Sequence, residues 1–147
     1  MTASAHALVG AAIARAIPNP LFSVPLAFVS HFIMDSVPHW DIGTNWRQRS
    51  KTTTGALAIA ETILGITVAY FLFAGKVADG GALFATILAS ELPDWLEAPW
   101  YVFFATKNKH KPAPHAGFWE KLTFQIYKIE NTFHTKTQAP LGVLTQV

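Results

Sequence analysis

The chain of 147 residues contains no cysteine and little charge. The absence of cysteine excludes disulfide bonds, thiolate metal ligands and cysteine nucleophiles. Charged residues make up only 14% of the sequence and hydrophobic residues 51%, a balance that favours a membrane protein over a soluble enzyme. The net charge is +2, and the basic residues gather in connecting segments without interleaved aromatic residues, so nucleic-acid binding is not expected.

Four apolar segments predict an all-α protein, built as a helical membrane bundle. They cover roughly residues 3–17, 22–37, 55–75 and 81–104, and turn-forming or basic residues separate them. The third segment has the length of a full membrane span, whereas the first two are short and favour a hairpin that enters the bilayer at an angle. We therefore expect about four transmembrane or partly inserted helices.

The distribution of basic residues between the loops predicts an orientation. Residues 45–51 and 107–111 each contain three Lys or Arg side chains, while the two loops at the other helix ends hold only Lys76. By the positive-inside rule, the N-terminus, the middle loop and the C-terminal region then lie in the cytoplasm. Arg15 is the first basic side chain, so the start of the chain does not resemble a cleavable signal peptide. We expect a multi-pass protein of the cytoplasmic membrane.

Residues 118–136 predict an amphipathic helix after a loop rich in proline, glycine and histidine. Its apolar side chains recur at helical spacing, at Trp119, Leu122, Ile126, Ile129 and Phe133. Such a helix could lie at the membrane interface or dock on the bundle. The chain thus divides into a bundle over residues 1–105 and a second part over 106–147, in which the basic loop, the amphipathic helix and an apolar tail pack on the bundle.

The stretch SHFIMDSVPHWD places ionisable groups where a buried helix is expected. His31 and Asp35 lie four residues apart, hence on one face of a helix. His39 and Asp41 follow Pro38, where the chain leaves the helix and can fold back toward that face. Imidazole and carboxylate are the ligands that zinc, manganese or iron accept when no thiolate is available. The spacing therefore indicates a divalent metal site, with zinc as the first candidate.

Ionisable residues also occur in the other apolar segments and in the amphipathic helix. A charge at the centre of a bilayer costs on the order of 3 kcal/mol, so several such groups imply a shared partner. The predicted metal ligands are His6, His31, Asp35, His39, Asp94 and His134. Glu91 or Glu61 would act as general base or accept a hydrogen bond from a ligand. Taken singly, each has a structural alternative, such as a His–Asp pair that stabilises a helix or a cation at a helix C-terminus.

The chain also aligns with itself at an offset of 55 residues. The alignment pairs Gly10 with Gly65, and it places His39 opposite Asp94, so that one potential ligand replaces another. The pattern is that of an internal duplication of two helix hairpins related by an axis along the membrane normal, although the identities are few. In this interpretation the two glycines are points of close packing between helices.

The motifs resemble those of a family of small bacterial inner-membrane proteins identified as membrane-bound metal-dependent hydrolases. The stretch SAHALVG, with His6, is similar to the family's first motif, and SVPHWD and ELPDW are similar to its second. The chain departs from the commoner PDxDH form because His39 replaces the aspartate after Pro38. A fainter similarity, through His31 and Asp35, is to the HxxxD motif of zinc-dependent phospholipase C and P1 nuclease. That similarity implies phosphoester hydrolysis at a metal centre.

These observations predict a membrane-embedded metal-dependent hydrolase that acts through a metal-activated water on an ester or phosphoester, which could be that of a lipid. Membrane lipid would be its partner, and the resemblance implies the bacterial inner membrane as its location. One alternative is a non-enzymatic transporter or ion-binding bundle, in which the same buried groups form a proton or cation path. Another is a soluble helical protein with a structural His–Asp network.

Overall fold

The computed structural model describes residues 1–138 and 141–145, and its regular elements there are all helical, which confirms the predicted all-α class. Residues 139–140 and 146–147, part of the predicted apolar tail, lie outside the described residues. The main helices are α1 (Ala3–Ala16), α2 (Pro20–Asp35), α3 (Lys51–Phe73), α4 (Gly80–Pro99) and α5 (Phe118–Phe133). The short elements are η1 (Trp46–Gln48), η2 (Ala74–Lys76), the π-helical turn η3 (Trp100–Phe104) and α6 (Leu141–Leu144).

Polar side chains mark the starts of three of these helices. Asn19 accepts a hydrogen bond from the amide of Leu21 at the start of α2, and Ser50 accepts one from Thr53 at the start of α3. Asp79 accepts two at the start of α4. Each satisfies amides that have no partner inside the helix. The apolar runs therefore begin as helices at defined positions, within a few residues of the predicted bounds.

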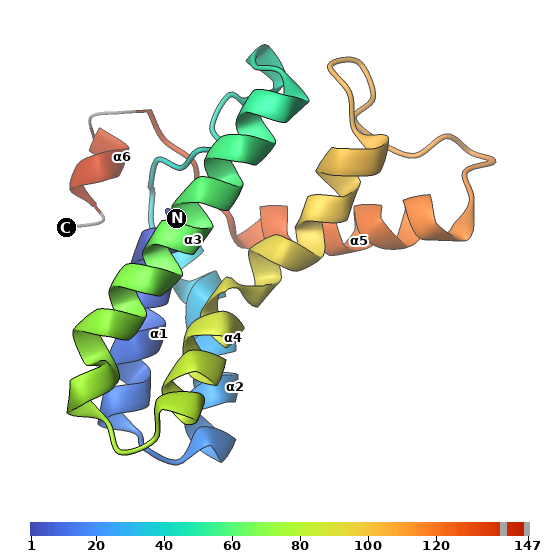
Figure 1. The fold of residues 1–147 in the computed structure, drawn as a ribbon. Helices are drawn as coiled ribbons and strands as arrows, with labels where there is room; N and C mark the ends of the chain where they lie inside the picture. The colour runs from blue at the N-terminus through green and yellow to red at the C-terminus, as the bar shows by residue number, and fades with distance from the viewer. Residues whose placement is uncertain (139–140, 146–147) are drawn as a thin grey trace.

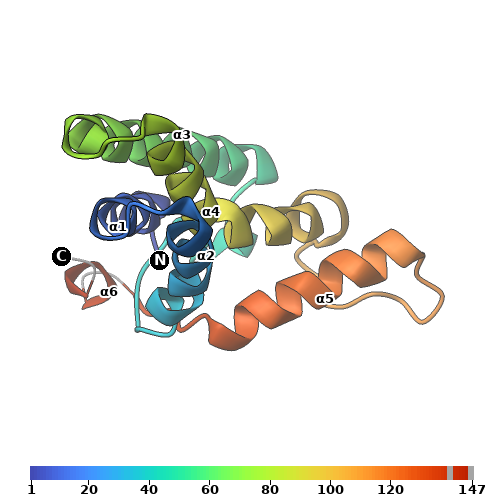
Figure 2. The same ribbon diagram turned by 90° about the horizontal axis from the view of Figure 1, so that it is seen from below.

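Helices α1 to α4 form a bundle, and α5 lies at a steep angle to it and extends beyond its side (Figure 1). Helix α1 packs against both α3 and α4, and α2 packs against α4. Seen from below, α5 lies on the side of α2 and α4 that is opposite α3 (Figure 2). The apolar core is built largely of small side chains and consists of Ala7, Ala11, Ala14, Ala69, Leu83 and Ile87. Small side chains allow the helix axes to approach closely.

Gly10 and Gly65 lie where helices touch, as predicted. A Cβ atom at Gly10 would lie 2.6 Å from Ser90 Oγ in α4, and one at Gly65 would lie 2.7 Å from Ser4 Cα in α1. Both distances are far below van der Waals contact. The two glycines therefore set the closest approach of α1 to its neighbours.

We expect Gly65→Ala to lower the free energy of unfolding by about 1–3 kcal/mol, because its methyl group would have to displace backbone atoms of α1. Gly55→Ala in the same helix is the matched control, since a Cβ there meets no neighbouring atom of the described residues within 4 Å. That variant should be neutral, or more stable by up to about 1 kcal/mol through helix propensity. Denaturation of both variants in detergent measures the difference. Equal effects of the two substitutions would contradict the packing role of Gly65.

Only α3, with its extension through η2, is long and apolar enough among the described helices to cross a membrane. Helix α2 is apolar but has 16 residues. The topology of about four inserted helices therefore stays a prediction for α1, α2 and α4.

The two helix hairpins of the proposed duplication are present, but their proline motifs differ in structure. Pro38 follows the end of α2, whereas Pro93 lies inside α4. His39 consequently extends from a non-helical segment and Asp94 from a helix. The duplication itself stays a prediction.

The predicted amphipathic helix is present as α5, but much of its apolar stripe is exposed. Trp119 is 69% and Ile129 is 56% exposed. The opposite face packs on η3, where Phe124 and Tyr127 contact the ring of Trp100 at centroid distances of 4.9 and 6.0 Å. Helix α5 therefore docks on the bundle mainly through aromatic residues outside the stripe. At its end Phe133 of the stripe contacts Phe32 of α2 at a centroid distance of 5.6 Å, whereas Trp119 and Ile129 stay exposed.

Candidate metal centre

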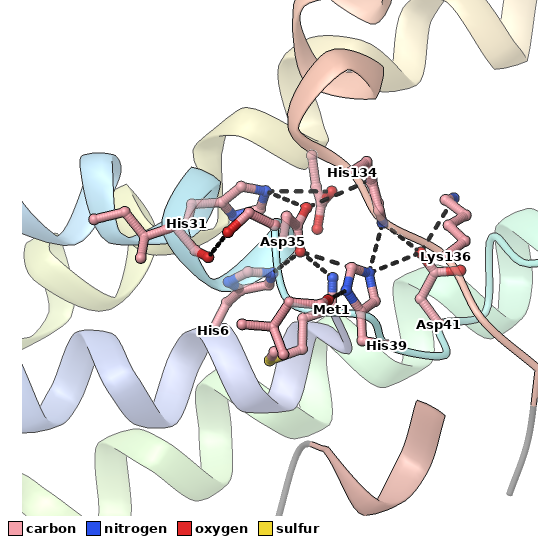
Figure 3. A network of polar contacts seen from close by, with 12 residues as sticks. Met1, His6, His31, Asp35, His39, Asp41, His134 and Lys136 are labelled. Atoms are coloured by element: carbon pink, nitrogen blue, oxygen red, sulfur yellow. Dashed lines mark hydrogen bonds and ion pairs between the residues drawn. The ribbon is translucent and has the colours of Figure 1, made fainter. Parts of the chain in front are cut away.

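The described structure brings all six predicted ligands together at one end of the bundle (Figure 3). His6 comes from the first turns of α1, and His31 and Asp35 from the end of α2. Asp94 comes from the second half of α4. Since α1 begins where α2 ends, these helices point their ligands into the same space.

The segment after α5 carries His134 to this site. It runs beside the segment after α2: the His39 amide donates to the Thr135 carbonyl at 3.0 Å, and the Thr137 amide donates to the His39 carbonyl at 2.7 Å. His39 and Lys136 form the isolated β-bridge of this pair. The backbone pairing places His134 next to His39 although 95 residues separate them.

The first group of possible ligands is His6, His31 and Asp94, whose donor atoms all lie within 4.8 Å of one another. The two imidazole rings are stacked at a centroid distance of 3.9 Å. His31 Nε2 lies 3.7 Å from Asp94 Oδ1. Both histidines are fully buried.

The second group is Asp35, His39 and His134, with donor atoms within the same 4.8 Å limit. The Nε2 atoms of the two histidines lie 2.7 Å apart. Asp41 adds a carboxylate to this group, because its Oδ2 lies 2.9 Å from His134 Nε2. Lys136 contacts the same oxygen at 3.1 Å.

Asp35, a member of the second group, lies between the two pairs of histidines, and each of its oxygens contacts one histidine of each pair. Oδ1 is 3.1 Å from His6 Nε2 and 3.7 Å from His39 Nε2. Oδ2 is 3.3 Å from His31 Nε2 and 3.5 Å from His134 Nδ1. The α-amino group of Met1 also pairs with Oδ1. One carboxylate thus joins two sets of histidines.

Backbone carbonyls fix the tautomers of two of the histidines. His31 Nδ1 donates to the Ser90 carbonyl and His39 Nδ1 to the Val37 carbonyl, each at 2.7 Å. A neutral imidazole that donates through Nδ1 carries its lone pair on Nε2, as metal-binding histidines commonly do. The Nε2 atom of His31 is buried without a hydrogen-bond partner among the described residues. This donor set therefore fits a divalent cation.

The electrostatics of the loop residues agree with a cation-binding role. Burial raises the pKa of Asp41, but its hydrogen bond with His134, the nearby His39 and the charge of Lys136 outweigh burial and hold that pKa well below its usual range. Burial lowers the pKa of His134, and its hydrogen bond with Asp41 only partly offsets this. An ionised carboxylate and a neutral imidazole are the states in which these residues bind metals.

The two predicted general bases occupy different surroundings. Glu91 is fully buried, and neither of its carboxylate oxygens has a hydrogen-bond partner among the described residues. Glu61 accepts hydrogen bonds from the Ser4 amide at 3.0 Å and the Ser4 hydroxyl at 3.2 Å. Glu61 and Asp94 line the same cavity. Glu61 is therefore the better placed of the two to meet a substrate that enters from this cavity.

Several residues of the site were missing from the predicted ligand set. Asp41 is part of the motif, but nothing in the sequence distinguishes it from an ordinary loop carboxylate. Its position two residues after His39 indicates a metal ligand only when the loop is known to fold back toward α2. Lys136 gave no signal, because its role depends on the backbone pairing with His39. The Ser90 carbonyl could not have been found from side-chain patterns.

Comparison of the chain with protein-family models, with curated proteins and with solved structures finds no match. The resemblance to membrane-bound metal-dependent hydrolases therefore stays a prediction that rests on the motif residues.

Glu130 of α5 faces the bundle near this site and is 7% exposed. Burial raises its pKa to about 7; His31 opposes the shift, and Asp94 and Asp35 add to it. The ordinary pKa of a glutamate is 4.5, so between pH 4.5 and about 7 Glu130 is ionised in the unfolded chain but still protonated in the fold. The metal-free fold should therefore lose stability as the pH rises through this range. We expect the free energy of unfolding of Glu130→Gln to exceed that of wild type by about 1–3 kcal/mol at pH 8 and to equal it at pH 4. Denaturation at both pH values tests this, and a pH-independent difference would contradict it.

Proposed function

We propose that the chain is a membrane-embedded, metal-dependent hydrolase of an ester or phosphoester. The observation that carries this proposal is the position of Asp35 between two buried groups of histidines and carboxylates, with imidazole nitrogens directed at one another. Four histidines in contact with one carboxylate are more than a single structural ion pair requires. The arrangement fits two divalent ions that share Asp35, one with His6, His31 and Asp94 and one with His39, His134 and Asp41.

Divalent ions at these positions would supply Lewis acidity and lower the pKa of a water molecule to near neutrality. The protein's own contribution is to orient the imidazoles through carbonyls and to accept a proton. In hydrolysis the water oxygen forms a bond to the carbonyl carbon or phosphorus, the bond to the leaving oxygen breaks, and that oxygen takes up a proton. We assign to Glu61 the acceptance of the proton from water, because Glu61 lines the same cavity as Asp94 of the metal centre.

The distribution of side chains supports a membrane location. Helix α3 packs on α1 along one side but is otherwise exposed, with only 11% of its most apolar stretch buried, which supports contact with lipid over a place in the core of a soluble protein. Large apolar side chains also face outward from the other bundle helices, among them Phe22 and Ile33 of α2 at 65% and 63% exposure. Histidines and carboxylates are buried at one end of the bundle, beside an apolar core of mostly small side chains. Polar groups inside and apolar groups outside is the arrangement that a bilayer favours.

The ends of the bundle differ in charge, which supports an orientation. The loops that contain the two basic clusters lie at one end, and the turns between α1 and α2 and between α3 and α4 lie at the other (Figure 1). We place the basic end, with the N-terminus and the metal centre, on the cytoplasmic side. A bacterial inner membrane would be the location that agrees with the motif resemblance.

The alternative of a proton or cation path has less support. A path across the membrane needs ionisable groups along the whole bundle. Those buried in the described helices lie in the half of the bundle where α1 begins and α2 ends, and the other half holds the alanine-rich core. The geometry therefore favours a closed site over a path.

Hydrolysis of chromogenic substrates by the detergent-purified protein tests the proposal. A phosphodiester, a phosphomonoester and a carboxylic ester are compared before and after removal of metal by a chelator, and after addition of zinc, manganese or iron(II). We expect hydrolysis of at least one of them to disappear on chelation and to return with one of these ions. Activity that survives complete removal of metal would contradict the proposal.

A further inference from the structure

A cavity of about 500 Å³ opens beside the metal centre, a volume typical of sites for small molecules. Helix α3 forms one wall, with Ala58, Ile59 and Ile63. The other wall consists of Trp95 and Ala98 of α4 and of residues from η3. Most of the wall is apolar, which is unusual beside a site so rich in ionisable groups.

Part of the cavity wall belongs to the metal centre itself. Asp41, Asp94, His134 and Lys136 all line the cavity. His134 and Lys136 both contact Asp41 directly, so these residues form one continuous polar region. A molecule in the cavity would meet ligands of the metal centre and a lysine at this region and apolar side chains elsewhere.

The apolar part of the cavity is continuous with the exposed surface of the bundle. Ile59 and Ile63 line the cavity and are nevertheless 63% and 61% exposed, and Val102 on the opposite wall is 57% exposed. Lys51 Nζ donates to the Val102 carbonyl at 3.2 Å and so links α3 to η3 at the cavity. In a bilayer these exposed apolar side chains at the opening of the cavity would allow a hydrocarbon chain to enter from the lipid.

From these observations we propose that the substrate is a phosphoester that carries a hydrocarbon chain, with the chain between α3 and α4 and the phosphate at the metal centre beside Lys136. This inference rests on the proposed hydrolase function and names its substrate class. The cavity wall carries Lys136 and Lys51, but also the carboxylates of Asp41, Glu61 and Asp94. The preference for an anionic head over a neutral ester therefore depends on the proposed divalent ions, which would offset these carboxylates and bind a phosphate beside Lys136. The buried Glu97 also lines the cavity, and its Oε2 has no hydrogen-bond partner among the described residues, so it is available to a polar group near the head.

Two substitutions in α3 distinguish an effect on the cavity from an effect on the rest of the helix. Ala58→Phe would place a ring in the cavity, and Ala60→Phe adds the same ring to an exposed position that does not line it. The zinc-loaded proteins in detergent are compared on a long-chain alkyl phosphodiester and on a soluble aryl phosphodiester. We expect Ala58→Phe to lower kcat/KM for the long-chain substrate at least tenfold and to change that for the soluble one less than twofold. Ala60→Phe should change neither.

A binding measurement separates failure of this inference from failure of the hydrolase proposal. A brominated alkyl phosphate should quench the fluorescence of Trp46 and Trp95, which both line the cavity, and Ala58→Phe should weaken this binding at least tenfold. Saturable binding without hydrolysis of any substrate would overturn the hydrolase proposal alone. Hydrolysis without any effect of Ala58→Phe on chain preference, or tighter binding of a neutral alkyl ester than of the phosphate, would overturn the assignment of the substrate.

Discussion

Asp35→Asn should abolish binding at both metal positions at once. Asparagine keeps the size of the side chain but removes the charge that both groups of histidines share. Loss of a residue that only supports a ligand already costs ten- to a hundredfold in metal affinity, so loss of a shared ligand should lower the affinity for each ion by at least a hundredfold. Titration of the metal-free protein with zinc, followed by calorimetry, measures both affinities.

Asp94→Asn is the informative partner of this variant, since Asp94 belongs to only one group of ligands. This variant should weaken the binding of one ion and leave the affinity for the other close to that of wild type. Thermal denaturation of the metal-free variants shows whether the fold is retained. If Asp35→Asn weakens the binding of only one ion, or of neither, Asp35 is not a shared ligand and the proposal of a two-ion centre is wrong.

Glu61→Gln should lower kcat by a factor of about 10² to 10⁴ without changing the metal content. The amide can keep the hydrogen bonds from Ser4 through its oxygen but cannot accept a proton from water. The measurement is steady-state hydrolysis of whichever substrate the wild type cleaves, together with the metal content of the same samples.

Glu120→Gln is the matched control, because Glu120 forms an ion pair with Lys109 away from the metal centre. It should leave kcat unchanged. Partial recovery of activity in Glu61→Asp would further support a role in proton transfer. A normal kcat in Glu61→Gln would show that Glu61 is not the proton acceptor. The buried Glu91 would then be the next candidate.

Much of the fold follows from local patterns in the sequence. The apolar runs are bounded by residues such as Asn19, Pro38 and Asp79, which start or stop helices for stereochemical reasons, so the helices α1 to α5 could be predicted from sequence alone. Gly10 and Gly65 were predictable as contact points because small residues recur where helices approach. The interval between His31 and Asp35 likewise determined that they share a helical face.

The parts that could not be predicted depend on contacts between distant segments. His134 reaches His39 only because residues 134–137 pair with the segment after α2, and no local pattern encodes that pairing. For the same reason the position of Asp35 between two groups of ligands, and the role of Asp41, emerged only from the structure. Pro93 shows the converse limit: it resembles the helix-ending Pro38 in sequence but lies inside α4.

The central claim, a two-ion centre in a membrane-embedded bundle, is tested most directly by elemental analysis of the detergent-purified protein. The wild type is measured beside the double variant His31→Ala, Asp35→Ala, with circular dichroism as a check that both are helical. We expect two equivalents of a divalent transition metal, zinc first among them, per wild-type chain and less than a tenth of that in the variant. The absence of stoichiometric metal from wild-type protein, even after incubation with zinc, manganese or iron(II), would contradict the account.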